Sequence, residues 1–321
     1  MMRDAVMDFS KQFTFKPVVM NGKKLKNKDA YVVCGMGGSQ LAASLLRNWD
    51  HLDIIPHRDY GLPNLNKIEM KRRLFIFSSY SGNTAETISG FKQALKAGLA
   101  MAAIAVGGEL LALAKKHNVP YVELPHTGIQ PRSALGFSLM GLLKLMGEDK
   151  AMREAKRLAK SLNPKSFESM GKKLALQLKD RVPVIYATNR NISVAYNWKI
   201  KLNETGKIPA FYNVLPELNH NEMNGFDVTE TSKHLSERFT FIFLTDAEDN
   251  KYNKQRMQVL HKLFSDRKLP VIEVPMEGRG RFHRMFMSLL IADWTAIYIA
   301  DLYGLESEQV PMVEEFKRLI D

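Results

Sequence analysis

The residues AYVVCGMGGSQ, at positions 30–40, place a short apolar run directly before a glycine-rich turn, and a helical pattern follows at residues 41–47. Short apolar runs bounded by glycine are typical of buried strands. Glycine lets the backbone approach a ligand closely, and the exposed amides at the start of a helix attract an anion. The stretch therefore predicts a strand, a ligand-binding loop and a helix in succession.

The same alternation of apolar runs and helical patterns continues along the chain. Further strands are expected at residues 73–78, 101–106, 120–124, 182–187, 211–214, 239–244 and 271–274. Such alternation predicts parallel sheets with crossover helices, here two doubly wound α/β domains of the flavodoxin-like α-β-α sandwich type. A polar helical stretch broken by Asn163-Pro164 interrupts the pattern. We therefore expect domains at residues 1–150 and 181–321, joined by a helical linker at residues 151–180.

Composition is that of a globular protein, because 321 residues with 45% hydrophobic and 25% charged residues can form two packed cores. The one cysteine, Cys34, ends an apolar run and suits a small buried hydrophobe. Residues 285–300 are apolar, but Asp293 interrupts them and they fall short of the roughly 20 residues that span a bilayer. We expect a buried helix there, no membrane segment, no secretory signal and a cytoplasmic location.

The net charge of +12 favours anionic partners through long-range attraction. Phosphorylated metabolites and nucleic acid both meet that condition. The basic residues are spread along the chain, however, and those of residues 150–173 are interspersed with Glu154 and Glu168, as on a solvated helix face. A small phosphorylated ligand is therefore favoured, and no nucleic-acid partner is expected.

A second candidate loop, SSYSGNT at residues 78–84, follows the next strong strand and enters another helix. Hydroxyls at such a junction can donate to phosphate oxygens while the helix amides supply further donors. The structural alternative is an ordinary helix cap formed by Asn83 or Thr84. A cap needs one such residue, and this loop offers more hydroxyls than that. The pattern therefore favours a site for a phosphomonoester.

A dinucleotide site is the lesser alternative for the first loop. Gln40 stands where the third glycine of the dinucleotide fingerprint belongs, although Asp53 lies near the right distance for an acid that binds ribose.

The second half of the chain carries two groups suited to moving protons on a sugar. Glu204 ends a helical pattern, and His220 lies within the polar turn PELNHNE at residues 216–222. A carboxylate can remove a carbon-bound proton, and an imidazole titrates close to neutral pH. The structural alternatives are a solvated glutamate near a helix end and a turn histidine that bonds the backbone.

Metal ligands do not cluster in the sequence, because the eight histidines are scattered. His283, beside Arg281 and Arg284, is expected on a helix surface.

The chain resembles the sugar isomerase (SIS) domain family, and within it the bifunctional phosphoglucose/phosphomannose isomerases. The resemblance rests on the two loops, on QPRSA at residues 130–134, on Glu204 with its preceding asparagine, and on PELNHNE. The resemblance covers nearly the whole chain. It implies an aldose-ketose isomerase of carbohydrate metabolism, in glycolysis or gluconeogenesis. Such an enzyme interconverts glucose 6-phosphate, and mannose 6-phosphate, with fructose 6-phosphate through an enediolate, without metal or cofactor.

The same resemblance implies a role for each site residue. Arg132 would stabilise the enediolate, Glu204 would carry the proton between C2 and C1, and Lys317 would reach the ring oxygen. His220 would open the ring in the partner's site, across the interface of a homodimer. The substrate phosphate would be bound by Gly37, Gly38, Ser39, Ser79, Ser81 and Thr84.

Two departures from the family pattern leave alternatives open. Residues 305–311 lack the usual Asp-Pro turn, and Thr205 replaces the usual asparagine after Glu204. The alternatives are an isomerase of another phosphosugar, such as an amino sugar or a heptose phosphate, and a non-catalytic phosphosugar sensor.

Overall fold

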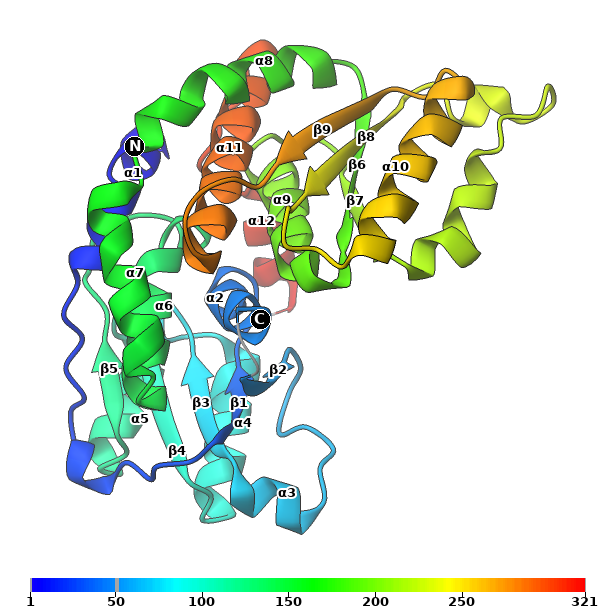
Figure 1. The fold of residues 1–321 in the computed structure, drawn as a ribbon. Coiled ribbons are helices and arrows are strands. Elements are labelled where there is room, and N and C mark those ends of the chain that lie inside the picture. Colours follow the sequence, from blue (N-terminus) through cyan, green and yellow to red (C-terminus); the bar gives the residue numbers. More distant parts are fainter. Residues whose placement is uncertain (1, 50–51, 321) are drawn as a thin grey trace. The chain divides into compact units, whose positions relative to one another are not determined.

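The computed structural model describes residues 2–49 and 52–320, which fold as two compact units (Figure 1). The first unit is Met7–Leu162, and the second combines residues 2–6 with residues 163–320. Of the predicted linker, helix α7 (Asp149–Ser161) belongs to the first unit and α8 (Glu168–Leu178) to the second.

The first unit is built on a five-stranded parallel sheet in the order β2-β1-β3-β4-β5. The strands are β1 (Ala30–Cys34), β2 (Asp53–His57), β3 (Leu74–Ser78), β4 (Met101–Ala105) and β5 (Tyr121–Glu123). Strands β1, β3 and β4 are buried at every position, as continuous apolar runs in a covered sheet should be. Its helices are α2 (Gly38–Arg47), α3 (Lys67–Arg72), α4 (Ala85–Lys96), α5 (Gly108–Lys116), α6 (Leu135–Met146) and α7.

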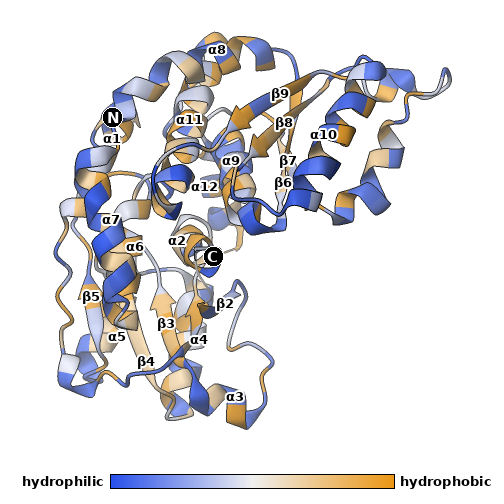
Figure 2. Cartoon of the chain, in the orientation of Figure 1, coloured by the Kyte–Doolittle hydropathy of each residue, from blue (hydrophilic) through white to orange (hydrophobic). Residues whose placement is uncertain are grey.

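The second unit has a four-stranded parallel sheet in the order β7-β6-β8-β9. Its strands are β6 (Val182–Thr188), β7 (Phe211–Leu215), β8 (Phe239–Thr245) and β9 (Val271–Pro275). The helices are α8, α9 (Ile192–Glu204), α10 (Lys251–Asp266), α11 (Arg281–Leu302) and α12 (Pro311–Ile320), together with α1 (Met2–Met7), all of which but Met7 belongs to this unit. Figure 2 shows β3 and β8 mostly in hydrophobic colours, whereas α7 and α10 carry long hydrophilic stretches.

These strand orders confirm the predicted doubly wound fold. The first sheet has the flavodoxin-like order, and the second repeats its first four places. In such sheets the chain leaves the central strand in opposite directions, and ligands bind beyond the carboxyl ends of the strands at that switch point. The switch points lie between β1 and β3 in the first unit and between β6 and β8 in the second.

Helix α11 confirms the buried helix expected near residues 285–300. By length and composition it could cross a membrane, but 83% of its most apolar window is buried inside the structure. Its Asp293 is paired with Lys201 of α9 at 2.6 Å, and both side chains are almost fully buried. This buried ion pair joins α11 to α9, and α11 is the core helix of the second unit because it is buried along most of its length.

Cys34 is also buried as expected, and burial raises the pKa of its thiol. His283, expected on a helix surface, is partly buried, and its neighbours Arg281 and Arg284 are both buried at the start of α11. Their charges are compensated by carboxylates that follow β8, which periodicity within one helix could not reveal.

Candidate functional site

The loop after β1 packs directly against the segment that carries Arg132. A Cβ atom on Gly38 would lie 2.6 Å from the backbone nitrogen of Arg132 and 2.6 Å from the carbonyl carbon of Pro131. Only glycine permits that approach. Gly37, with φ of +48°, also occupies the left-handed region that favours glycine.

Ser39 connects the two predicted phosphate loops. Its hydroxyl oxygen accepts a hydrogen bond from the backbone N–H of Tyr80 at 2.8 Å. Its carbonyl oxygen accepts one from the hydroxyl of Ser78 at 3.0 Å. The loops after β1 and β3 therefore form one continuous surface at the switch point of the first sheet.

Within the second loop, Ser79 and Ser81 are placed differently. Ser79 is fully buried, accepts from the backbone N–H of Gly82 at 3.0 Å and is hydrogen-bonded to the hydroxyl of Thr84 at 2.8 Å. Ser81 is exposed, and its hydroxyl oxygen accepts from the N–H of Asn83 at 3.2 Å. Ser79 thus shapes the loop, while the hydroxyl proton of Ser81 remains available to a ligand.

The capping alternative for this loop is wrong for α4. Thr84 occupies the N-cap position but makes no side-chain cap hydrogen bond. Asn83 instead accepts from the N–H of Glu109, at the start of the neighbouring helix α5. Gly82, with φ of +80°, lies so close to Gly107 that a Cβ would come within 1.9 Å of its carbonyl oxygen. The loop is therefore held by its neighbour, and the first amides of α4 are left without a side-chain cap.

The position of Asp53 does not support a dinucleotide site in the first loop. Asp53 begins β2 and is paired in register with Ala30, the first residue of β1. It therefore lies at the amino-terminal ends of the strands, whereas the ligand loops follow the carboxyl-terminal ends. Its carboxylate pairs with Arg73 at 2.8 Å and Arg72 at 2.7 Å, and the hydrogen bond from Arg73 lowers the pKa of Asp53.

Arg132 is buried, with 2% of its surface exposed. Gln12 supports its segment: the side chain donates to the carbonyl of Ser133 at 2.7 Å and accepts from the N–H of Gly136 at 2.9 Å. One carboxamide thus connects the Arg132 turn to the first turn of α6. No sequence motif points to Gln12, because its partners lie more than 120 residues away.

In the second unit, Glu204 is the last residue of α9 and is half-buried. The ammonium group of Lys207 donates to the Glu204 carbonyl, and the side chain of Asn203 donates to the carbonyl of Ile208 at 2.9 Å. Lys201, three residues before Glu204, is paired with Asp293, and this contact also holds the end of the helix in place. A firmly held helix end limits the directions in which the Glu204 side chain can point, which suits a group that must accept a proton in a defined direction.

His220 lies exposed at the end of a short 3₁₀ turn, Glu217–His220. Among the described residues its ring makes no hydrogen bond, so the structure does not support the turn histidine that bonds the backbone. Glu222, two residues later, anchors the loop instead. Its carboxylate accepts hydrogen bonds from the hydroxyl of Tyr186 at 2.6 Å and from the side chain of Asn213 at 2.5 Å. Burial raises the pKa of the Tyr186 hydroxyl, which keeps it protonated as a donor.

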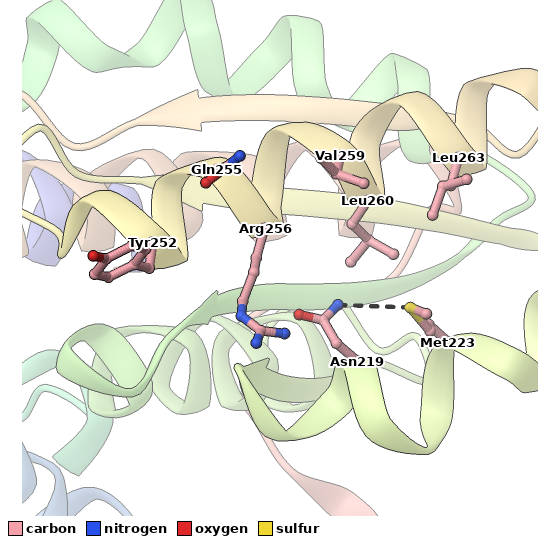
Figure 3. Close-up of a pocket in the computed structure, with 8 residues that line it drawn as sticks. All are labelled: Asn219, Met223, Tyr252, Gln255, Arg256, Val259, Leu260 and Leu263. Carbon is pink, nitrogen blue, oxygen red and sulfur yellow. Dashed lines mark hydrogen bonds between the residues drawn. The ribbon is translucent and has the colours of Figure 1, made fainter.

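A groove of about 450 Å³ lies between this loop and α10 (Figure 3). Its wall combines apolar side chains with Arg256, which reaches from α10 toward Asn219. The groove therefore adjoins the segment that carries His220.

Lys317 lies on α12, every described residue of which is exposed. Its ammonium group pairs with Glu314 one turn earlier, at 2.9 Å. The predicted site residues thus fall into two groups. The loops and Arg132 belong to the first unit, and Glu204, His220 and Lys317 belong to the second.

Residues 167–320 match the family described as the bacterial phospho-glucose isomerase C-terminal SIS domain. A bifunctional phosphoglucose/phosphomannose isomerase of Aquifex aeolicus is 33% identical over 97% of this chain and 96% of its own length. Another with that name, from Thermoplasma volcanium, is 30% identical over 98% of this chain and 100% of its own length.

Among solved structures, glucosamine-6-phosphate deaminase of Thermotoga maritima superposes with a TM-score of 0.66 at 15% identity, covering 97% of this chain and 96% of that one. Similarity at this level concerns the fold. The near full-length relatives are more specific: the chain belongs to the family of bifunctional phosphoglucose/phosphomannose isomerases.

Proposed function

We propose that this protein is an aldose-ketose isomerase that interconverts glucose 6-phosphate and mannose 6-phosphate with fructose 6-phosphate. The close approach of Gly38 to Arg132 is the observation that carries the proposal. It brings the backbone of the buried Arg132 against the start of α2, and the loops that enter α2 and α4 contain no carboxylate. Family membership supports the same activity.

In this proposal the phosphate binds at the starts of α2 and α4, near the backbone of Gly37 and Gly38 and the hydroxyl groups of Ser39, Ser81 and Thr84. Ser79, which the resemblance also assigned to phosphate, keeps the loop in the required shape through its two internal hydrogen bonds.

The chemical step is proton transfer. With the ring opened by His220, assisted by Lys317, the Glu204 carboxylate removes the proton from C2 of the open-chain aldose. The released electron pair forms the C1=C2 double bond, and the carbonyl oxygen at C1 takes the negative charge, which Arg132 stabilises. Glu204 then returns the proton to C1 while the hydroxyl proton of the oxygen at C2 passes to the oxygen at C1, so that C2 becomes the ketone and C1 carries a hydroxyl. Return to either face of C2 in the reverse direction would give both epimers.

Substitution of Ser81 tests the phosphate loop. Ser81→Ala removes one hydrogen bond to a charged group, worth about 1.5–3 kcal/mol, and is expected to raise KM at least about tenfold with a smaller change in turnover. Steady-state kinetics with glucose 6-phosphate measure both quantities. Ser89→Ala, on α4 beyond the loop, is the matched control. An unchanged KM in Ser81→Ala would place the phosphate elsewhere.

We further propose a homodimer in which His220 serves the partner's site. The exposure of His220 and the absence of a hydrogen bond to its ring within the described residues support an intermolecular role. Self-complementary dimers contain two equivalent sites, so each chain would both lend and receive a histidine. A cytoplasmic location and a role in glycolysis or gluconeogenesis belong to the same proposal.

Complementation tests this arrangement. Inactive Glu204→Gln and inactive His220→Ala proteins are mixed under conditions that allow subunit exchange. Half of randomly paired dimers are mixed, and each mixed dimer has one intact site, so about a quarter of the wild-type activity is expected. No recovery after exchange has been verified by mass-tagged subunits would assign both residues of a site to one chain.

A further inference from the structure

The two units place equivalent loops at their switch points, but with different residues. Strand β1 ends at Cys34 and α2 begins at Gly38, while β6 ends at Thr188 and α9 begins at Ile192, so each intervening loop has the same length. The residue directly after β3 is Ser79 in the first unit. The residue directly after β8 is Asp246 in the second.

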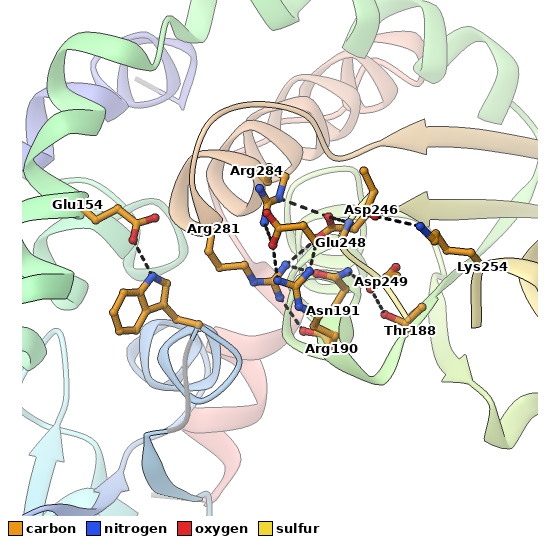
Figure 4. A network of polar contacts seen from close by, with 12 residues as sticks. Glu154, Thr188, Arg190, Asn191, Asp246, Glu248, Asp249, Lys254, Arg281 and Arg284 are labelled. Carbon is orange, nitrogen blue, oxygen red and sulfur yellow. Dashed lines mark hydrogen bonds and ion pairs between the residues drawn. The ribbon is translucent and has the colours of Figure 1, made fainter. Parts of the chain in front are cut away.

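Asp246 is bound there as an external anion would be. Its fully buried carboxylate accepts hydrogen bonds from Arg281 at 2.9 Å and Arg190 at 3.1 Å. It lies 3.4 Å from the guanidinium of Arg284 and accepts from the backbone N–H of Glu248 at 3.0 Å. Figure 4 shows these three guanidinium groups gathered around it.

A second carboxylate completes the arrangement. Glu248 binds Arg190 at 2.6 Å and is paired with Arg284, while its own side chain is 53% exposed. Three guanidinium groups therefore surround two carboxylates, which together carry the charge of a phosphomonoester dianion. Guanidinium groups are the preferred protein ligands of phosphate, because their paired N–H donors match its oxygens.

The neighbouring carboxylates stabilise the buried charges of these arginines. Burial lowers the pKa of Arg281 to about 10, and the neighbouring Arg190 acts in the same direction. Arg281 is also fixed by donating to the side chain of Asn191 at 2.6 Å and to the carbonyl of Arg190 at 2.7 Å. Its guanidinium is therefore oriented by neutral partners as well as by Asp246, as in a preformed anion site.

We infer that the arginine cluster at the switch point between β6 and β8 is a phosphate-type anion site occupied by the chain's own Asp246 and Glu248. The second unit therefore binds no phosphorylated ligand at its switch point. Removal of these two carboxylates would leave the three guanidinium groups with Asp249, which accepts from Thr188 and Asn191, as the neighbouring carboxylate.

The test compares two double variants by calorimetric titration with inorganic phosphate in chloride buffer at constant ionic strength. Asp246→Ala with Glu248→Ala removes both charges and opens the space. Asp246→Asn with Glu248→Gln removes the same charges but fills the space with amides. The first variant is expected to bind one more phosphate per chain than the wild type. The second variant is expected to bind no additional phosphate. This difference does not depend on phosphate binding in the first unit.

Failure of the first double variant to fold in chloride, with folding restored by phosphate, would also support the site. If it folds in neither buffer, the single variants decide, because Glu248 is exposed and its loss should be tolerated. Glu248→Ala is then expected to bind an additional phosphate at least tenfold more tightly than Glu248→Gln. Equal phosphate binding by the folded alanine and amide variants would overturn the inference.

Discussion

The Glu204→Gln variant is expected to lose about two to four orders of magnitude in turnover, the usual worth of a positioned proton transfer. Glutamine has the size and shape of glutamate but cannot accept the C2 proton. Substrate binding should change little, because the phosphate contacts belong to the other unit. Steady-state kinetics in both reaction directions would give turnover and KM separately.

The matched control is Glu237→Gln, which removes a charge from an exposed glutamate of the same unit. It should retain wild-type kinetics. Circular dichroism of both variants would verify the fold. Near-normal turnover in Glu204→Gln would remove this glutamate from the mechanism.

A second large effect is expected from Gly38→Ala, although it adds only one methyl group. That methyl would meet the backbone of Pro131 and Arg132 at 2.6 Å, and backbone cannot turn aside as a side chain can. Overpacking of this kind costs about 1–3 kcal/mol of stability. Because displacement of a catalytic group by about 1 Å can cost roughly a hundredfold in rate, turnover should fall by about that factor.

Gly107→Ala provides the comparison. A Cβ at Gly107 meets nothing within 4 Å, and its backbone is extended, so the same methyl should be tolerated there. Turnover and urea denaturation would be measured for both variants. Full activity in Gly38→Ala would show that the approach of the glycine loop to Arg132 is not required.

Most of the fold could be predicted because the buried strands are continuous apolar runs. Strand β2 was missed for a physical reason: it contains Pro56, begins with the charged Asp53 and is only partly buried, so it lacks that signature. It lies at the edge of the sheet, where such residues are tolerated.

The candidate site was predictable where its residues are neighbours in sequence. The loops around Ser39 and Ser81 are contiguous motifs, and the chemistry of each is visible in its own residues. Gln12 and Tyr186 act through partners that are distant along the chain, 121 and 36 residues away. Only the folded structure reveals such contacts, and it alone distinguishes the buried Ser79 from the exposed Ser81.

The arginines at the start of α11 show the same limit. Arg281 and Arg284 belong to a basic stretch that is usually solvated, yet carboxylates from the loop after β8 allow both to be buried. Their burial depends on a pairing between segments about 35 residues apart.

In the proposed reaction this protein converts an aldose phosphate to a ketose phosphate by proton transfer. The most direct measurement follows glucose 6-phosphate labelled with deuterium at C2, incubated with the purified protein and analysed by nuclear magnetic resonance. We expect formation of fructose 6-phosphate with at least part of the deuterium lost to solvent, because a carboxylate that holds the C2 proton can exchange it. Absence of any ketose phosphate, or complete transfer of the deuterium to C1 as in a hydride shift, would contradict it.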